Sequence, residues 1–158
     1  MVRVCSNLQG QELLICGSKK GKILIYSLAM GQLVAEVQNA HYLAINDLDL
    51  SHASDTARQG DLIITAGQDS KVKIWNLSAL LSQSNFSNDT SMLGSSNSQN
   101  GCYHEFSEHT AAVSSVKFSY GASLDRAFSG SLDKTFKVYD LPSKLVIRTV
   151  QLSSQVLN

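Results

Sequence analysis

One short unit recurs along this chain, and it constrains the fold more than any other feature of the sequence. Residues 13–28, 62–77 and 126–141 align without gaps. Each stretch has an apolar run, a turn of small or charged residues, and a second apolar run that closes on Tyr26, Trp75 or Tyr139. Two apolar runs of strand length around a tight turn predict a β-hairpin. Because the hairpin repeats, the sequence predicts a fold built from stacked copies of one unit.

The rest of the chain also consists of short runs in which apolar and polar residues alternate. Each run has the length of a strand and is rich in Val, Ile, Leu or aromatic residues, and no long segment keeps a helical period. The runs are residues 13–17, 22–28, 33–37, 45–50, 62–66, 72–77, 112–118, 127–129, 135–141 and 145–150. The sequence therefore predicts an all-β chain.

A histidine precedes each strand that lies between consecutive hairpins. His41 comes before the run at residues 45–50, and His109 comes before the run at residues 112–118. In the hairpin that follows each histidine, a hydroxyl residue, a carboxylate and an aromatic residue stand at matching offsets. The two sets are His41, Thr65, Asp69 and Trp75, and His109, Ser129, Asp133 and Tyr139.

This joint pattern resembles the WD repeat, and the resemblance covers most of the chain. The usual Gly-His start and Trp-Asp ending of that repeat occur in altered form, as Ala40-His41, Glu108-His109, Trp75-Asn76 and Tyr139-Asp140. The resemblance implies a β-propeller of four-stranded blades. A propeller closes with about four to eight blades, but residues 1–158 hold hairpins for only about three. We therefore expect an incomplete propeller: a fragment, a truncated isoform or a partial gene model.

The resemblance to WD repeats also implies a role for the two sets. In such repeats the Asp accepts hydrogen bonds at the hairpin turn and orients the His, and the hydroxyl links the His to the aromatic residue. The same residue types make up a catalytic triad, but a brace that recurs in each blade suits a scaffold, whereas an enzyme needs one site. We expect structural networks and no enzyme. Tyr139 in place of a tryptophan leaves the last link of its set open, and the first hairpin has Cys16 and Lys20 at the matching positions and cannot form the network.

Residues 78–101 interrupt the repeat. About half of them are Ser or Asn, a composition that buries too little apolar surface to offset the entropy lost on ordering. We predict a disordered loop inserted between the third and fourth strands of one blade. In the alternative, Leu80, Leu81, Met92 and Leu93 dock on a partner protein.

The charge of the chain argues against two classes of partner. The formal net charge is zero, and nucleic acids and anionic membranes both attract a strongly basic surface. Lys19, Lys20 and Lys22 are the nearest thing to a basic stripe, and we interpret them as a solvated turn. No apolar run approaches the roughly 18–20 residues that cross a bilayer, and residues 1–10 do not resemble a signal peptide.

The cysteines indicate neither a disulfide framework nor a metal site. Cys5, Cys16 and Cys102 are scattered and lack the paired short spacing of zinc ligands. No Gly-rich phosphate loop follows a strand and opens a helix, so nucleotide binding has no support either. We expect an intracellular protein with reduced thiols and without a cofactor.

Within the WD family, the chain resembles one branch over approximately residues 13–152. Three features carry this resemblance: Tyr42 directly after His41, the long polar insertion between Trp75 and His109, and residues 121–138. The branch is the WD-repeat subunit of the nuclear Rix/PELP-type complex, which matures precursors of the large ribosomal subunit.

Membership of that branch implies a scaffold in large-subunit assembly and in processing of the spacer RNA. For yeast-type members it also implies a link to DNA replication initiation, through loading of the replicative helicase. The implied partners are a helical-repeat scaffold, another large subunit of the complex and the pre-ribosomal particle, on which a dynein-like ATPase also acts. The implied location is the nucleolus and nucleoplasm. Two alternatives are a generic WD adaptor, for example a ubiquitin-ligase substrate receptor, and a hydrolase that uses His109, Ser129 and Asp133.

Overall fold

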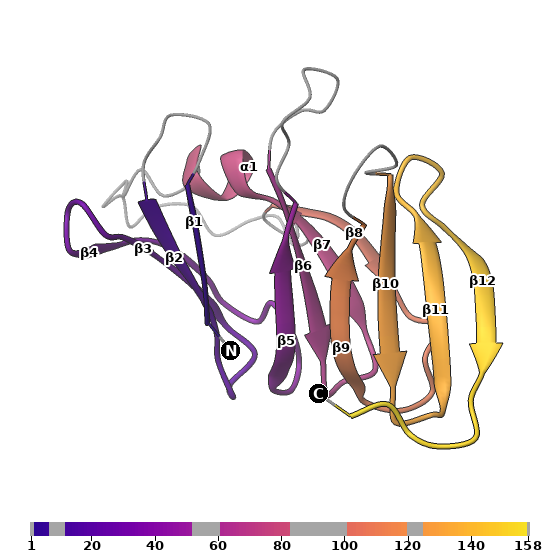
Figure 1. Cartoon of the computed structure of the whole chain (residues 1–158). Helices are drawn as coiled ribbons and strands as arrows, with labels where there is room; N and C mark the ends of the chain where they lie inside the picture. Colours follow the sequence, from indigo (N-terminus) through magenta and orange to yellow (C-terminus); the bar gives the residue numbers. More distant parts are fainter. Residues whose placement is uncertain (1, 7–11, 52–60, 83–100, 120–124, 158) are drawn as a thin grey trace, which may run out of the picture.

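Three sheets make up the protein, and they stand beside one another as blades (Figure 1). The computed structural model describes residues 2–6, 12–51, 61–82, 101–119 and 125–157. In this part of the chain twelve strands form the three four-stranded sheets, and every neighbouring pair of strands is antiparallel. The prediction of an all-β, incomplete propeller with about three blades is confirmed.

Each blade consists of four consecutive strands in chain order. Blade one holds β1 (Val2–Ser6), β2 (Glu12–Gly17), β3 (Ile23–Ser27) and β4 (Gln32–Val37). Blade two holds β5 (Ile45–Leu50), β6 (Leu62–Gly67), β7 (Val72–Asn76) and β8 (Cys102–Phe106). Blade three holds β9 (Val113–Phe118), β10 (Arg126–Ser131), β11 (Thr135–Asp140) and β12 (Leu145–Gln151). The first strands of neighbouring blades lie next to one another, β1 beside β5 and β5 beside β9.

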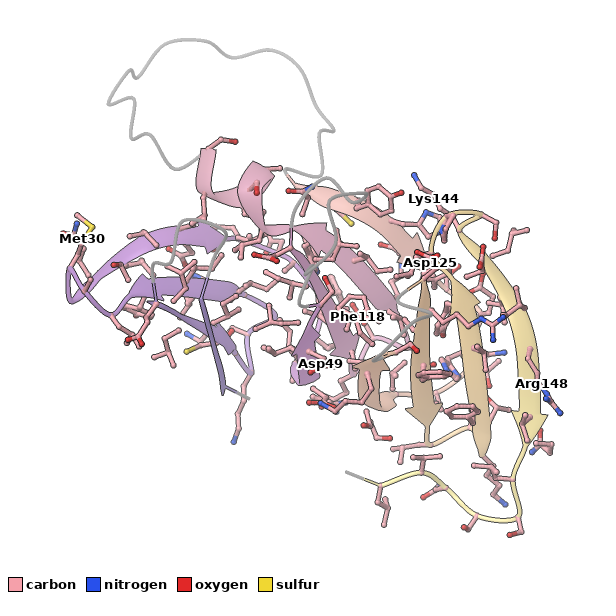
Figure 2. The ribbon with its side chains drawn as sticks, turned by 45° about the horizontal axis from the view of Figure 1, so that its top comes forward. Met30, Asp49, Phe118, Asp125, Lys144 and Arg148 are labelled. Carbon is pink, nitrogen blue, oxygen red and sulfur yellow. The ribbon has the colours of Figure 1, made fainter. Side chains whose placement is uncertain are left out.

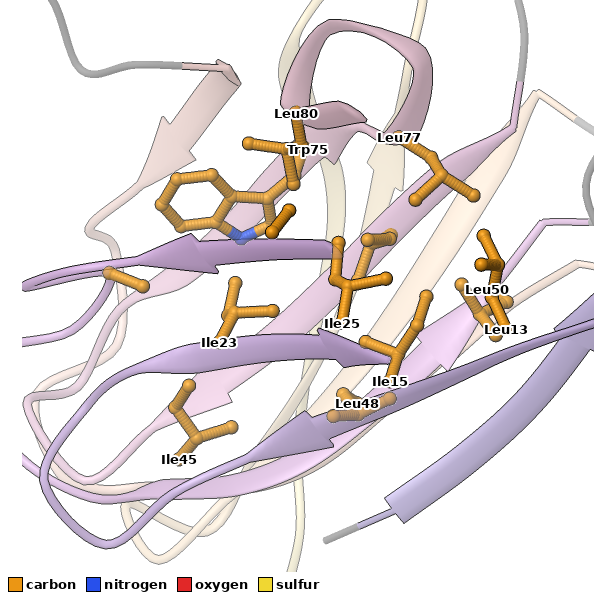
Figure 3. Close-up of a cluster of buried hydrophobic side chains, with 13 residues drawn as sticks. Leu13, Ile15, Ile23, Ile25, Ile45, Leu48, Leu50, Trp75, Leu77 and Leu80 are labelled. Carbon is orange, nitrogen blue, oxygen red and sulfur yellow. The ribbon is translucent and has the colours of Figure 1, made fainter. Parts of the chain in front are cut away.

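The first hydrophobic core lies between blades one and two. Ile15, Ile23 and Ile25 of blade one face Leu48 and Trp75 of blade two (Figure 3). All five side chains are at most 2% exposed. Burying a side chain of this size stabilises a fold by about 1.5–3 kcal/mol, so this core is a main source of stability.

The second core lies between blades two and three. Ile64 and Ile74 of blade two pack with Phe118 and Tyr139 of blade three. Because neighbouring residues on a strand point to opposite faces, Ile63 enters the first core and Ile64 enters the second. Blade two is therefore apolar on both faces, which explains the nearly continuous apolar run in β6.

The far face of blade three carries apolar side chains at the positions that blade two buries. Phe128 and Phe136 align with Ile64 and Val72, both of which are 0% exposed. The two phenylalanine rings stack with their centroids 5.8 Å apart, and both side chains are half-buried. The face of blade three therefore has the composition of a face between blades.

The hairpin turns share one backbone conformation. Gly21, Ser70 and Lys134 occupy the same position in the three turns and have φ angles of 71°, 67° and 63°. This left-handed region costs glycine least. A side chain at Gly21 would also overlap the carbonyl oxygen of His41, because the connection from β4 to β5 crosses the turn there. Because Ser70 and Lys134 adopt the same φ with a side chain, the close approach of His41, and not the φ angle alone, requires glycine in blade one.

The segment that joins β7 to β8 begins with a helix and not with the expected loop. Helix α1 (Leu77–Ser82) follows β7 directly, and the side chain of Asn76 caps it by accepting the Ala79 N–H at 2.9 Å. Leu80 is 4% exposed in the first core, so this leucine packs on the protein itself. Leu81 is partly buried against the same core, whereas residues 83–100, with Met92 and Leu93, lie outside the described residues.

The two ends of this segment meet on blade two. The Asn76 N–H donates to the carbonyl of Gly101 at 3.1 Å. Gly101 has a φ of 82° and lies so close to Leu80 that a side chain at this position would overlap it. The ends are therefore held together beside α1. In the described part of the chain, no helix is long and apolar enough to pass through a membrane.

Candidate functional site

The first predicted set joins blades one and two at the connection between β4 and β5. His41 Nδ1 lies 2.9 Å and 3.1 Å from the two carboxylate oxygens of Asp69, and His41 Nε2 lies 2.7 Å from Thr65 Oγ1. The indole N–H of Trp75 donates to the same Thr65 oxygen at 3.0 Å. The structure thus brings all four residues into one chain of hydrogen bonds.

The direction of this chain follows from what each group can donate. An indole N–H only donates and an ionised carboxylate only accepts. His41 Nδ1 therefore donates to the Asp69 carboxylate, and His41 Nε2 and the Trp75 indole N–H both bond to the Thr65 hydroxyl. Asp69 also accepts the backbone N–H groups of Tyr42 at 2.9 Å and Lys71 at 3.2 Å. Every polar atom of the set has a partner, which lets it remain buried.

The charge on Asp69 is strongly favoured. Burial by itself would raise the pKa of this carboxyl, but the hydrogen bond and charge of His41 and the two backbone N–H groups lower it to about 2. The carboxylate is ionised at neutral pH as a result. It fixes both the hairpin turn and the imidazole ring.

The second predicted set makes the corresponding network in blade three. His109 Nδ1 lies 2.8 Å from Asp133 Oδ2, and His109 Nε2 lies 2.6 Å from Ser129 Oγ. The Tyr139 hydroxyl lies 2.8 Å from the same Ser129 oxygen. The link that the tyrosine left open in the sequence is therefore made, because a phenol hydroxyl reaches the serine from the position of an indole.

Burial governs the ionisation of the second set. It lowers the pKa of His109, although the hydrogen bond and charge of Asp133 act in the opposite direction, and it raises the pKa of Tyr139. Burial would also raise the pKa of Asp133, but hydrogen bonds from Thr135 and His109 bring it well below the usual range. At neutral pH the set consists of a neutral imidazole, a neutral phenol and an ionised carboxylate.

Blade one closes its turn without such a network. Cys16 and Lys20 occupy the positions of the hydroxyl and the carboxylate, and Cys16 is a half-buried free thiol. The Ser18 side chain instead accepts the Lys22 N–H at 2.9 Å, and Lys22 Nζ forms an ion pair with Glu36 at 3.0 Å. In blade one a local hydrogen bond within the turn, from the Lys22 N–H to Ser18, replaces the four-residue network.

The geometry of the two sets limits their chemistry. Thr65 is 0% exposed and Ser129 is 2% exposed, and each hydroxyl is already bonded to a histidine and an aromatic residue. A nucleophile must reach the reacting atom of a substrate, and these oxygens are covered by the protein. In the residues that the structure describes, no three His, Cys, Asp or Glu side chains gather in a way that could hold a metal ion.

Two further residues connect the blades, and sequence reasoning missed them. On β5, Asp47 is 1% exposed and Asp49 is 5% exposed. Asp47 accepts the Val116 N–H at 3.2 Å, and Asp49 accepts the Phe118 N–H at 3.0 Å and pairs with Lys117 at 3.2 Å. Asp49 and Phe118 meet where β5 faces β9 (Figure 2). The available signal was a pair of carboxylates two residues apart on β5, on either side of the apolar Leu48.

The chain is similar in sequence to parts of several longer proteins. It is 32% identical over 145 residues to the pre-rRNA-processing protein IPI3 of Meyerozyma guilliermondii, covering 91% of this chain and 29% of that protein. It is 28% identical over 144 residues to the protein of the same name in Candida albicans, covering 90% of this chain and 25% of that protein. It is also 28% identical over 134 residues to mitochondrial division protein 1 of Saccharomyces cerevisiae, covering 83% of this chain and 17% of that protein.

The chain therefore spans at most 29% of these three relatives. A family profile gives a more general classification. The WD domain, G-beta repeat, matches residues 31–76 and 100–140, which together make up more than half of the chain. These ranges contain all residues of both histidine sets and strands from all three blades. The chain belongs to the WD-repeat family.

Proposed function

We propose that the protein is a non-catalytic scaffold in a complex that matures precursors of the large ribosomal subunit and processes their spacer RNA. The observation that carries the pathway is the similarity over nine tenths of the chain to two proteins named for pre-rRNA processing. Because the chain corresponds to less than a third of either protein, the proposal concerns the complex in which the whole protein works.

The buried networks support the non-catalytic part of the proposal. The same four-residue arrangement recurs in blades two and three, and its hydroxyls are 0% and 2% exposed. A repeated, enclosed and fully bonded set stabilises a hairpin, and it offers no oxygen to a substrate. We assign His41, Thr65, Asp69 and Trp75, and their counterparts in blade three, a structural role.

The partners and the location follow from the proposed pathway. We propose that the protein binds a helical-repeat scaffold subunit and the pre-ribosomal particle in the nucleolus and nucleoplasm. A zero net charge supports contact through proteins rather than directly through RNA. We extend the proposal to DNA replication initiation, which resemblance to the same branch implies.

Affinity purification of the tagged, full-length protein tests this function. We expect large-subunit precursors to co-purify and to co-sediment with it in a gradient, and its depletion to cause accumulation of precursor RNA that retains the spacer. Absence of the protein from these particles would refute the proposal.

Replacing one serine distinguishes the proposed scaffold function from the alternative of a hydrolase. Ser129→Ala removes the hydroxyl on His109 Nε2, which is the one that a triad with His109 and Asp133 would use. We expect spacer processing to fall only as far as the abundance of the protein falls. Ser107→Ala, at an exposed serine, serves as the matched control. Loss of processing at normal abundance in Ser129→Ala alone would contradict the scaffold.

The similarity to mitochondrial division protein 1 supports a second candidate, a general WD adaptor of another complex. The same purification distinguishes the two. Recovery of ubiquitin-ligase subunits or of proteins of mitochondrial division, without ribosomal precursors, would replace the first proposal with the second.

A further inference from the structure

A hollow opens at the end of blades one and two where the histidine network lies. It has a volume of about 460 Å³ and is lined mainly by Lys20, Tyr42, Lys71, Lys73 and the His41–Asp69 pair. These residues come from the β2–β3 turn, the β4–β5 connection, the β6–β7 turn and β7. We call it the Tyr42 hollow. Three separate segments of the chain thus converge on one depression.

The wall of the Tyr42 hollow is held in place by the protein backbone. The Tyr42 N–H donates to Asp69 at 2.9 Å, and the N–H of the preceding His41 donates to the Gly21 carbonyl at 2.9 Å. These bonds tie the β4–β5 connection to the turns of both blades. A ligand would therefore meet a preformed surface, which lowers the entropy lost on binding.

Tyr42 is exposed in a way that the fold does not require. Its side chain is 91% exposed, although its backbone is fixed, and the next residue, Leu43, is 44% exposed. A tyrosine side chain has few rotatable bonds and contributes a large contact area for little loss of side-chain freedom, and tyrosines are enriched among the residues that dominate binding energy. The ring is therefore well placed to be an anchor for a partner.

The lysines give the Tyr42 hollow an excess of positive charge. Lys71 and Lys73 share one carboxylate, Glu105, with Lys73 Nζ at 3.0 Å from it. Lys20 forms no ion pair with any described residue. Asp69 is already occupied by His41 and two backbone N–H groups. Lys20 and the 40% exposed Lys71 are thus available to a carboxylate from outside.

We propose that the Tyr42 hollow binds an acidic segment of a partner protein. Carboxylates of the segment pair with Lys20 and Lys71, and an apolar side chain next to them packs on the ring of Tyr42. The proposal rests on the proposed function in that it treats the protein as an interaction scaffold. A protein segment is favoured over RNA because the formal net charge of the chain is zero, and a run of phosphates binds through a more extended basic surface.

Fluorescence anisotropy with the full chain tests the proposal. The probe is a short labelled peptide of alternating Glu and Leu, and a peptide of alternating Lys and Leu and an oligouridylate are the comparison ligands. Of these three ligands, we expect only the acidic peptide to bind. We expect Lys20→Glu and Tyr42→Ala each to weaken binding by about tenfold, whereas Tyr42→Phe retains it.

Lys19→Glu is the matched control. Lys19 lies in the same turn and its replacement changes the net charge by the same amount, but it does not line the Tyr42 hollow. We expect little change in affinity. Equal losses in Lys19→Glu and Lys20→Glu, tighter binding of oligouridylate, or no binding of the acidic peptide by the folded protein would each overturn the proposal.

A crosslinking measurement in cells does not depend on purified variants. With p-benzoylphenylalanine at position 42 of the full-length protein, crosslinks to acidic segments are expected, and crosslinks to basic segments or to RNA would refute the inference. Failure here is distinct from failure of the proposed function. If the protein co-sediments with ribosomal precursors but Lys20→Glu and Tyr42→Ala bind the peptide normally, only the proposal for the Tyr42 hollow is refuted. If these variants lose peptide binding but the protein is absent from ribosomal precursors, only the proposed pathway is refuted.

Discussion

Removing the hydroxyl at the centre of the blade-two network gives the sharpest test of its structural role. Thr65→Val keeps the shape of the side chain but removes the partner of both the Trp75 indole N–H and His41 Nε2. Both groups are at most 2% exposed, and each unsatisfied buried polar group costs about 1–3 kcal/mol. We therefore expect a loss of about 2–6 kcal/mol, a large part of the roughly 5–15 kcal/mol that stabilises a domain.

Urea unfolding followed by tryptophan fluorescence measures this loss at the site, because Trp75 is the single tryptophan of the chain. Thr65→Ser keeps the hydroxyl and removes one methyl group, which should cost about 1 kcal/mol. Cys16→Val makes a comparable change at the matching position of blade one, which has no network, and should change stability by less than about 1 kcal/mol. If Thr65→Val were as stable as Thr65→Ser, the network would not brace the blade.

Three further predictions concern charge and the open blade. Because the pKa of Asp69 falls from 3.8 to about 2 on folding, its contribution is complete above about pH 4 and is lost as the pH falls towards 2; acid titration of Asp69→Asn should show less loss across this interval, and parallel curves would contradict this. Asp49→Leu leaves the Phe118 N–H without its acceptor, so hydrogen exchange there should become at least about tenfold faster, and unchanged exchange would exclude a contribution of Asp49. The isolated chain should self-associate through the far face of blade three, and Phe128→Lys should reduce this in sedimentation experiments, whereas a monomeric, cooperative thermal melt of the unmodified chain would refute it.

The strands and hairpins could be predicted because their signals are local. Alternation places Ile63 and Ile64 on opposite faces, and the same turn position recurs at Gly21, Ser70 and Lys134 whatever the residue there. The members of both histidine sets could also be named from their offsets. The Tyr139 link could not, because it depends on how far a phenol reaches once the ring is packed in the core.

What the sequence did not reveal depends on packing between distant segments. Helix α1 is short and has weak local signals, and the burial of Leu80 depends on a space that blades one and two create together. The carboxylate of Asp49 accepts the N–H of Phe118, which is 69 residues away. No local sequence pattern predicts which strand of a neighbouring blade a carboxylate will contact. These contacts follow only from the way successive blades stack.

The joined ends of the segment between β7 and β8 have a consequence for how the protein can vary. Asn76 and Gly101 hold the two ends at a fixed separation beside α1, whatever lies between them. The free energy of closing a chain between fixed ends grows only as the logarithm of its length, by about 0.6 kcal/mol for each doubling. The position is thus a built-in insertion point, where evolution can lengthen the chain, or an experimenter can graft a reporter domain, without reopening the blade.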